Sequence, residues 1–259
     1  MHPHPRPYAA SIMDAMIGLG REMRDLLLPR GCAGCDLPDA VLCDSCTGLF
    51  GHDVIRPVSA TVIASGRVHA CGTYRGEVRH AILMWKDHDD QELDAEFGHL
   101  IAGCLRRSGE IGMLFTHRGH RGHAASVAVV PAPSTPSSMR RRGRFHTITL
   151  ANAITEELQR QGVRARCVPA LSITGTQAKS VQTGGAKARS DRLRNHIHVN
   201  RDLLHGCHTS ILVDDIITTG STMRQCAQAL HGAGVPVRTG FALAAVPAPS
   251  ERDQSSSML

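Results

Sequence analysis

The stretch from Ile211 to Thr222 reads I-L-V-D-D-I-I-T-T-G-S-T, and the rest of the chain is best understood from it. Its first three residues are β-branched or aliphatic, which is typical of a strand buried on both faces. Two carboxylates, Asp214 and Asp215, follow where we expect that strand to end. Beyond the small residues of the turn, apolar side chains recur at helical spacing from Met223 to Leu230. The pattern predicts a strand, a turn and a helix.

The residues around this turn favour one kind of ligand. In open α/β sheets, ligands bind beyond the carboxyl ends of the strands. A helix start offers unpaired backbone N–H groups and a positive dipole end, which suit a phosphate, and Gly220 allows a close backbone approach. Carboxylates repel a phosphate, but they accept hydrogen bonds from a vicinal diol. We therefore predict a sugar phosphate site; the alternative is an ordinary strand, turn and helix with a solvated acidic edge.

The same stretch resembles the motif that binds phosphoribosyl pyrophosphate (PRPP) in type I phosphoribosyltransferases. The resemblance implies that Asp214 and Asp215 hold the ribose 2′- and 3′-hydroxyls and serve in catalysis. In the same way, the cradle for the 5′-phosphate corresponds to Thr218, Thr219, Gly220, Ser221 and Thr222. The implied fold is an α/β type I phosphoribosyltransferase fold, a mainly parallel twisted sheet flanked by helices. Mg²⁺ would accompany PRPP and keep several of its waters.

Composition limits the alternatives. With 259 residues, the chain can form one substantial domain with a small module. Aromatic residues make up 3% of the chain, which argues against a surface that stacks single-stranded bases. A formal charge of +6 fits anionic substrates and nucleic acid equally. No apolar run approaches the roughly 18 residues of a membrane span, and the N-terminus lacks a signal-peptide core, so we expect a cytoplasmic protein without a membrane partner.

Four cysteines form two C-x-x-C pairs, Cys32 with Cys35 and Cys43 with Cys46. In a reducing compartment such pairs are metal ligands rather than disulfides. Four thiolates on two tight turns match tetrahedral zinc, so we expect a structural zinc knuckle over residues 31–50. A site with four protein ligands leaves no position for catalysis. A redox pair, or cysteines without a common role, are the alternatives.

The elements upstream of the core follow from apolar spacing. An N-terminal segment of residues 1–30 is expected to hold an amphipathic helix. Short strands are expected from Val54 to Thr73, followed by helices from Tyr74 to Lys86 and from Glu92 to Arg107. We assign these elements to a hood region of residues 51–124.

The zinc knuckle, the Y-x-G-x-V-R segment that begins at Tyr74 and reaches Lys86, and the PRPP motif occur in this order in the bacterial ComF family, which the chain resembles. The resemblance implies a phosphoribosyltransferase-like core and a link to natural competence and DNA uptake. ComF relatives usually have R-G-F-N-Q before the helix that we expect from Thr147 to Gln161. This chain has Arg144-Phe145-His146-Thr147 there, so the contacts of the Asn and Gln are in doubt.

Residues 125–246 form the expected phosphoribosyltransferase core, which begins with a strand from Ala125 to Val130. The implied fold places Pro133 and Ser134 in a loop that contacts pyrophosphate. Four arginines follow: Arg140, Arg141, Arg142 and Arg144. They would neutralise departing pyrophosphate, contact a nucleic-acid backbone or form a solvated helix start. For the pyrophosphate role we assign Arg142 and Arg144.

Residues 172–195 are too long and polar for an ordinary connector. By resemblance they form a flexible loop that folds over the substrate, where Lys187, Arg189 and Arg192 would close over pyrophosphate. Strands are then expected from Ile197 to Val199 and from Val237 to Ala245, and a disordered tail over residues 247–259.

Two functions fit these features. The first is an enzyme that transfers a phosphoribosyl group from PRPP to an unknown nitrogen acceptor, mainly by positioning and charge stabilisation. The second is a non-catalytic ComF module that acts in DNA uptake or recombination through single-stranded DNA or a DNA-processing protein. Fold analogy alone does not decide between them.

Overall fold

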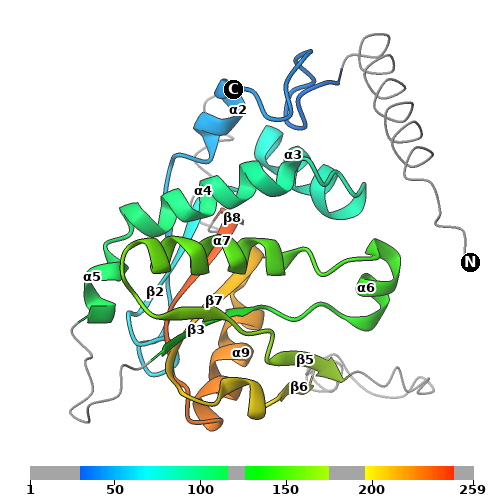
Figure 1. Ribbon diagram of the computed structural model, residues 1–259. Coiled ribbons are helices and arrows are strands. Elements are labelled where there is room, and N and C mark those ends of the chain that lie inside the picture. Colours follow the sequence, from blue (N-terminus) through cyan, green and yellow to red (C-terminus); the bar gives the residue numbers. More distant parts are fainter. Residues whose placement is uncertain (1–29, 116–125, 175–195, 248–259) are drawn as a thin grey trace, which may run out of the picture.

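A computed structural model of the chain describes residues 30–115, 126–174 and 196–247. These ranges contain both strands and helices (Figure 1). The strands are β1 (Val54–Pro57), β2 (Arg67–Thr73), β3 (Ser126–Pro131), β4 (Ala165–Cys167), β5 (Leu171–Thr174), β6 (His196–Val199), β7 (Cys207–Ile217) and β8 (Val237–Ala245). The helices are α2 (Asp44–Leu49), α3 (Gly76–Asp87), α4 (Leu93–Arg107), α5 (Glu110–Phe115), α6 (Pro136–Arg142), α7 (Thr147–Arg160), η1 (Asp202–Leu204) and α9 (Ser221–Gly232).

One sheet carries the candidate site, and its strand order is β1-β2-β8-β7-β3-β4. The edge strand β1 is antiparallel to β2, and every other neighbouring pair is parallel. β7 lies in the interior, where Ile211 pairs with Val129 of β3 and Thr239 of β8. The mixed α/β fold with a mainly parallel sheet is therefore confirmed. β5 and β6 form a separate antiparallel pair.

Helices cover both faces of the sheet (Figure 1). On one face α3, α4 and α7 pack against the strands, and the fully buried Trp85 and Phe97 belong to the same apolar cluster as Val213. On the other face α9 supplies Met223 to the cluster that contains Leu212. The apolar run of β7 is thus buried on both faces, as its composition predicts.

The predicted end of the central strand is wrong. β7 continues past Asp214 and Asp215 to Ile217, because its pairing with β8 continues as far as Ile217 and Ala245. Both carboxylates therefore project from within a paired strand.

Pro133 and Ser134, the predicted loop residues, lie outside any helix or strand, and residues 136–142 after them form a helix that was not predicted, α6. Pro136 occupies the first helical position, where its missing N–H costs nothing. The Thr135 hydroxyl accepts a hydrogen bond from the Ser138 N–H and so caps the helix. Arg140, Arg141 and Arg142 consequently lie in a short helix of their own, which precedes α7.

The region predicted as a hood contributes to the main sheet. β2 pairs with β8 in the core, with Ala70 opposite Ala242, and β1 extends the sheet beyond β2. The same region supplies α3, α4 and α5. One sheet therefore crosses the expected boundary at residue 124.

Several predictions concern residues outside the described ranges. These are the helix within residues 1–29, the tail beyond residue 247, most of the loop of residues 172–195, and the basic residues Lys187, Arg189 and Arg192. Among the described residues, no helix is long and apolar enough to cross a membrane.

Candidate functional site

The turn between β7 and α9 is exposed, and within it the Thr219 hydroxyl donates to that of Ser221 at 3.2 Å and accepts the Ser221 N–H at 3.4 Å. Thr218, Thr219, Ser221 and Thr222 are all exposed. α9 begins after Gly220 and has no side-chain cap, so its first N–H groups lack intrahelical partners. A hydrogen bond from the Arg224 guanidinium to the Thr219 carbonyl, 3.2 Å long, places a cation beside the turn. The predicted cradle is thus an accessible positive helix end.

Gly220 has φ of +69°, the left-handed region in which a side chain is strained. A Cβ at this position would meet only the tip of Arg224, 3.8 Å away. Glycine is therefore required for the backbone conformation that turns β7 into α9, and not for lack of space.

The two aspartates of β7 point to opposite faces of the sheet. Asp215 lies on the face of α3 and α7, where its Oδ2 accepts hydrogen bonds from Lys86 Nζ at 2.5 Å and from His146 Nε2 at 2.9 Å. Asp214 lies on the face of α9, and its Oδ1 accepts the N–H of Asp215 at 2.9 Å. Its charge adds to burial in raising the pKa of Cys226 on α9.

One oxygen of Asp215 is still available to a ligand. Its two partners share Oδ2, and among the described residues nothing donates to Oδ1. The diol role of Asp214 and Asp215 stays a prediction, and for Asp215 it now rests on this second oxygen.

The pKa values of the two aspartates move in opposite directions. Burial, then the neighbouring charge of Asp215, raises the pKa of Asp214 well above its usual value. Burial also disfavours ionisation of Asp215, but the hydrogen bond from His146 and the charge of Lys86 outweigh it and lower its pKa below the usual range. The pKa of Asp215 is therefore lowered and that of Asp214 raised, so Asp215 loses its proton at a lower pH than Asp214.

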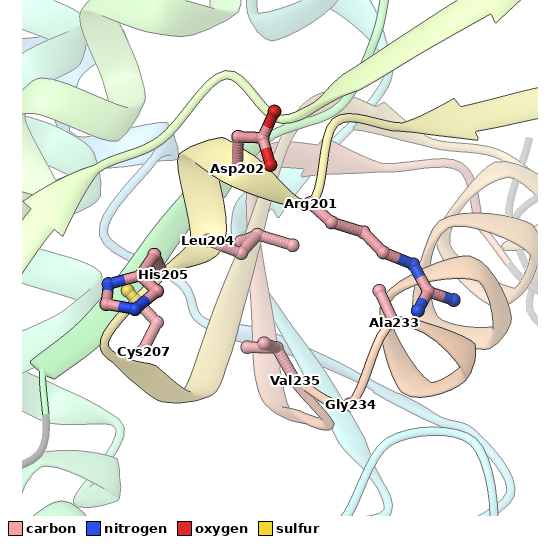
Figure 2. Close-up of a pocket in the computed structure, with 8 residues that line it drawn as sticks. All are labelled: Arg201, Asp202, Leu204, His205, Cys207, Ala233, Gly234 and Val235. Atoms are coloured by element: carbon pink, nitrogen blue, oxygen red, sulfur yellow. The ribbon is translucent and has the colours of Figure 1, made fainter.

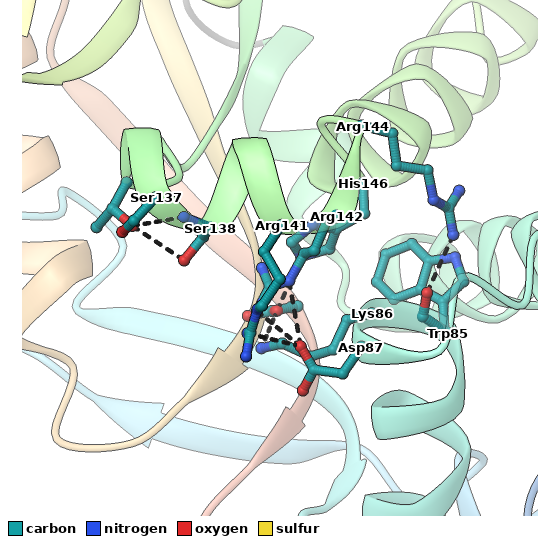
Figure 3. Close-up of polar contacts among 11 residues, drawn as sticks. Trp85, Lys86, Asp87, Ser137, Ser138, Arg141, Arg142, Arg144 and His146 are labelled. Atoms are coloured by element: carbon teal, nitrogen blue, oxygen red, sulfur yellow. Dashed lines mark hydrogen bonds and ion pairs between the residues drawn. The ribbon is translucent and has the colours of Figure 1, made fainter.

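Ion pairs join the end of α3, the loop after it and the start of α4 to α6 and the segment between α6 and α7. Figure 3 shows the pairs that Asp87 makes. Arg141 and Arg142 approach the same oxygen of Asp87, at 3.0 and 3.2 Å. Arg144 pairs with Asp89 and Asp94, at 2.9 and 2.7 Å. We call these contacts the clamp.

Trp85 lies at the centre of the clamp. Arg144 donates to its carbonyl at 3.1 Å and lies over its ring, 5.6 Å from the centroid. The His146 ring meets the indole edge-on, with centroids 4.9 Å apart. The clamp therefore fixes both His146 and the neighbouring Lys86 against Asp215.

The clamp gives the arginine cluster a structural role that the sequence did not predict. Arg141, Arg142 and Arg144 all have carboxylate partners, while Arg140 is exposed. Contacts of these arginines with pyrophosphate or a nucleic acid stay predictions. Of the proposed pyrophosphate loop, Pro133 is buried and Ser134 half-buried at the carboxyl end of β3.

The four predicted zinc ligands come together. The Sγ atoms of Cys32, Cys35, Cys43 and Cys46 lie within 4.8 Å of one another. A tetrahedral zinc with Zn–S bonds of about 2.3 Å would place its sulfurs about 3.8 Å apart, and Cys35 and Cys43 are 3.6 Å apart. The donor set and its spacing therefore fit a structural zinc.

The backbone around the cluster is arranged for thiolates. Cys32 Sγ accepts the N–H groups of Gly34 at 3.4 Å and Cys43 at 3.3 Å. Burial opposes ionisation of Cys32, but these backbone donors prevail and lower its pKa to about 6. A Cβ at position 34 would lie 2.6 Å from Cys46 Sγ, so only glycine fits between the ligands.

The zinc knuckle packs on α3. The carbonyl of Gly34 lies 3.2 Å from His80 Nδ1, and Phe50 packs on Phe97 of α4 with ring centroids 5.5 Å apart. The knuckle therefore braces the helix whose other end carries Lys86.

A separate hollow lies at the opposite, amino-terminal edge of the sheet (Figure 2). It has a volume of 480 Å³, with Arg201 and His205 at its rim and Val235 in its lining. Arg201 donates to the carbonyl of Gly232, so it caps the C-terminal end of α9. We do not assign this hollow to the candidate site.

Sequence reasoning missed the partners of Asp215. Lys86 was expected only as the end of a helix, and His146 only as a departure from the ComF pattern. The acid-rich stretch of residues 87–94 and the arginine-rich stretch of residues 140–144 have complementary charges. This complementarity could have indicated the clamp, but not the partners of Asp215.

Comparisons with known proteins give limited information. No protein-family model matches the chain, and no curated protein matches it. Among solved structures, it is similar to an adenine phosphoribosyltransferase from Thermoanaerobacter pseudethanolicus, with 14% identity over 61% of this chain and 78% of that one, at a TM-score of 0.30.

It is also similar to an allosteric regulatory enzyme of purine biosynthesis, with 17% identity and a TM-score of 0.27. That match covers 51% of this chain but only 24% of the other protein. TM-scores this low carry no conclusion about function, so the function is argued from the site itself.

The metal site generates a first prediction. Cys43→Ser should abolish the binding of about one zinc ion per chain and lower the unfolding midpoint by about 5 °C or more, because structural zinc stabilises the fold directly. Elemental analysis and thermal unfolding measure the two effects. Cys167→Ser, at a half-buried cysteine outside the cluster, is the control. Full zinc content in the Cys43 variant would contradict the assignment.

The raised pKa of Asp214 generates a second prediction. Because the folded protein resists its ionisation, the wild type loses stability as pH rises from the usual carboxyl pKa of about 4 through the higher folded value. Asp214→Asn should therefore be more stable than the wild type at neutral pH, and this advantage should shrink as the pH falls toward about 4. Urea unfolding across this range tests it; a difference that is independent of pH would refute it.

Proposed function

We propose that the chain binds the ribose 5-phosphate portion of PRPP at the carboxyl edge of the sheet. The observation that carries the proposal is the continuous path of β7 into α9. One strand presents Asp214 and the open oxygen of Asp215, and the next residues form an exposed, uncapped helix start. Carboxylates suit hydroxyls, and the helix start suits a phosphate, so one ligand with a diol and a phosphate satisfies both.

The reaction that suits such a site is transfer of the phosphoribosyl group to a nitrogen acceptor. This chemistry requires placement of the sugar and stabilisation of separating charges more than a single acid or base. Bound Mg²⁺ would supply charge neutralisation at the pyrophosphate. Asp214 and Asp215 would orient the ribose through its hydroxyls, and the acceptor is not specified by any described residue.

The alternative of a non-catalytic ComF module acting on DNA would depend on the basic cluster of residues 140–144. Three of its four arginines already pair with carboxylates in the clamp. No contact of the described residues favours DNA over a sugar phosphate, so we retain the first proposal.

A single added charge at the turn tests the proposal. Ser221→Asp places a carboxylate at the first position of α9, where it favours the helix dipole but repels a phosphate. We expect the variant to be at least as stable as the wild type, yet to bind ribose 5-phosphate at least about tenfold more weakly, a change of about 1.4 kcal/mol. Calorimetry measures the affinity.

Asn200→Asp is the matched control, since it adds the same charge at an exposed position preceding η1, near the other edge of the sheet. It should leave the affinity unchanged. Equal weakening in both variants, or wild-type affinity in the Ser221 variant, would refute the phosphate site.

A further inference from the structure

Lys86 is a buried cation at the candidate site that no motif assigns. It lies at the last turn of α3, with its side chain 14% exposed, and its Nζ is 2.5 Å from Asp215 Oδ2. The side chain of Asp215 is also largely buried, at 12% exposure. An ion pair in such a position must compensate for the loss of water around two charges.

The fold does not depend on this ion pair for the contact between its elements. Arg144 with Asp94, Arg142 with Asp87, and the Trp85 ring on His146 already join α3 and α4 to α6 and the segment before α7. A buried ion pair can often be exchanged for apolar residues without loss of stability. The charge of Lys86 is therefore not needed to hold these elements together, which leaves it free for a role toward a ligand.

The hydrogen-bond inventory of Lys86 points the same way. An ammonium group has three donors, and among the described residues only Asp215 Oδ2 accepts one of them. Among the described residues, no donor contacts the neighbouring oxygen of Asp215. Arg141 and Arg142 lie near Lys86, where both pair with Asp87 (Figure 3). The remaining N–H donors of Lys86 suit an anionic group.

We propose that Lys86 contacts the ligand directly: while it holds Asp215 through one N–H, it donates another to the pyrophosphate group of PRPP. This inference rests on the proposed function and adds α3 to the elements that bind the substrate. The inference also assigns different roles to two parts of the site. The turn before α9 holds the 5′-phosphate, and Lys86 recognises the group at the opposite end of the ribose.

The test replaces Lys86 in the Asp215→Asn background, in which position 215 carries no charge. Lys86→Met alone would leave the buried Asp215 carboxylate with His146 as its one remaining partner among the described residues, and would endanger folding. We therefore compare Asp215→Asn with the double variant Asp215→Asn and Lys86→Met, in which both side chains are uncharged. Calorimetry with two probes, PRPP in the presence of Mg²⁺ and ribose 5-phosphate, gives four affinities.

If Lys86 contacts pyrophosphate, the double variant should bind PRPP at least about tenfold more weakly than Asp215→Asn, while ribose 5-phosphate affinity changes by less than about twofold. If Lys86 serves only as the partner of Asp215, both variants will bind PRPP equally, which would overturn the inference. An equal loss for both probes would overturn it too, because the contact would then lie on the ribose phosphate.

Arg164→Met in the Asp215→Asn background is the matched control, since it removes one positive charge at an exposed position on the opposite edge of the sheet. It should change neither affinity. If the wild type binds neither probe, the proposed function itself is refuted. If the wild type binds both probes but the Lys86 substitution has no effect, only the inference about Lys86 is refuted.

Discussion

Adjacent residues of a β-strand face opposite sides of a sheet, and this alternation governs the site. Because β7 remains paired through both aspartates, Asp214 and Asp215 cannot act as one symmetrical pair. Asp215 enters the side of α3 and α7, where a lysine and a histidine keep it ionised. Asp214 lies on the side of α9, and its pKa is raised. The strand thus gives two identical side chains different chemistry.

The predicted zinc knuckle and the clamp both fix the position of α3, which carries Lys86. The knuckle contacts α3 near its start through His80, and the clamp fixes its end through Trp85 and Asp87. Between them they determine where Lys86 meets Asp215. A metal site closed to chemistry would in this way support a ligand site on another part of the fold, by fixing the position of one helix.

Local patterns predicted the parts of the structure that depend on neighbours in sequence. The apolar run Ile211 to Val213 predicted a buried strand, the T-T-G-S-T turn predicted the start of α9, and the spacing of the four cysteines predicted their cluster. α6 was missed although Thr135 followed by Pro136 is a helix-start signal. Polar residues there resemble a loop when the cap is overlooked.

The spacing of residues in the sequence does not predict contacts between residues that are far apart in the chain. Lys86 and His146 are 129 and 69 residues from Asp215, and nothing in either local sequence marks them as its partners. The same holds for Arg144, whose charge suggested a ligand but whose contacts are with Asp89 and Asp94. Which charges pair is decided by how α3, α6 and α7 pack on the sheet.

The central claim is that a sugar phosphate places its phosphate on the first N–H groups of α9. Amide chemical shifts, followed by NMR while ribose 5-phosphate is added, test this most directly. Saturable shifts should concentrate on the amides of residues 219–223, and ribose without phosphate should not reproduce them. Shifts confined to other parts of the chain, or equal shifts with plain ribose, would contradict the claim.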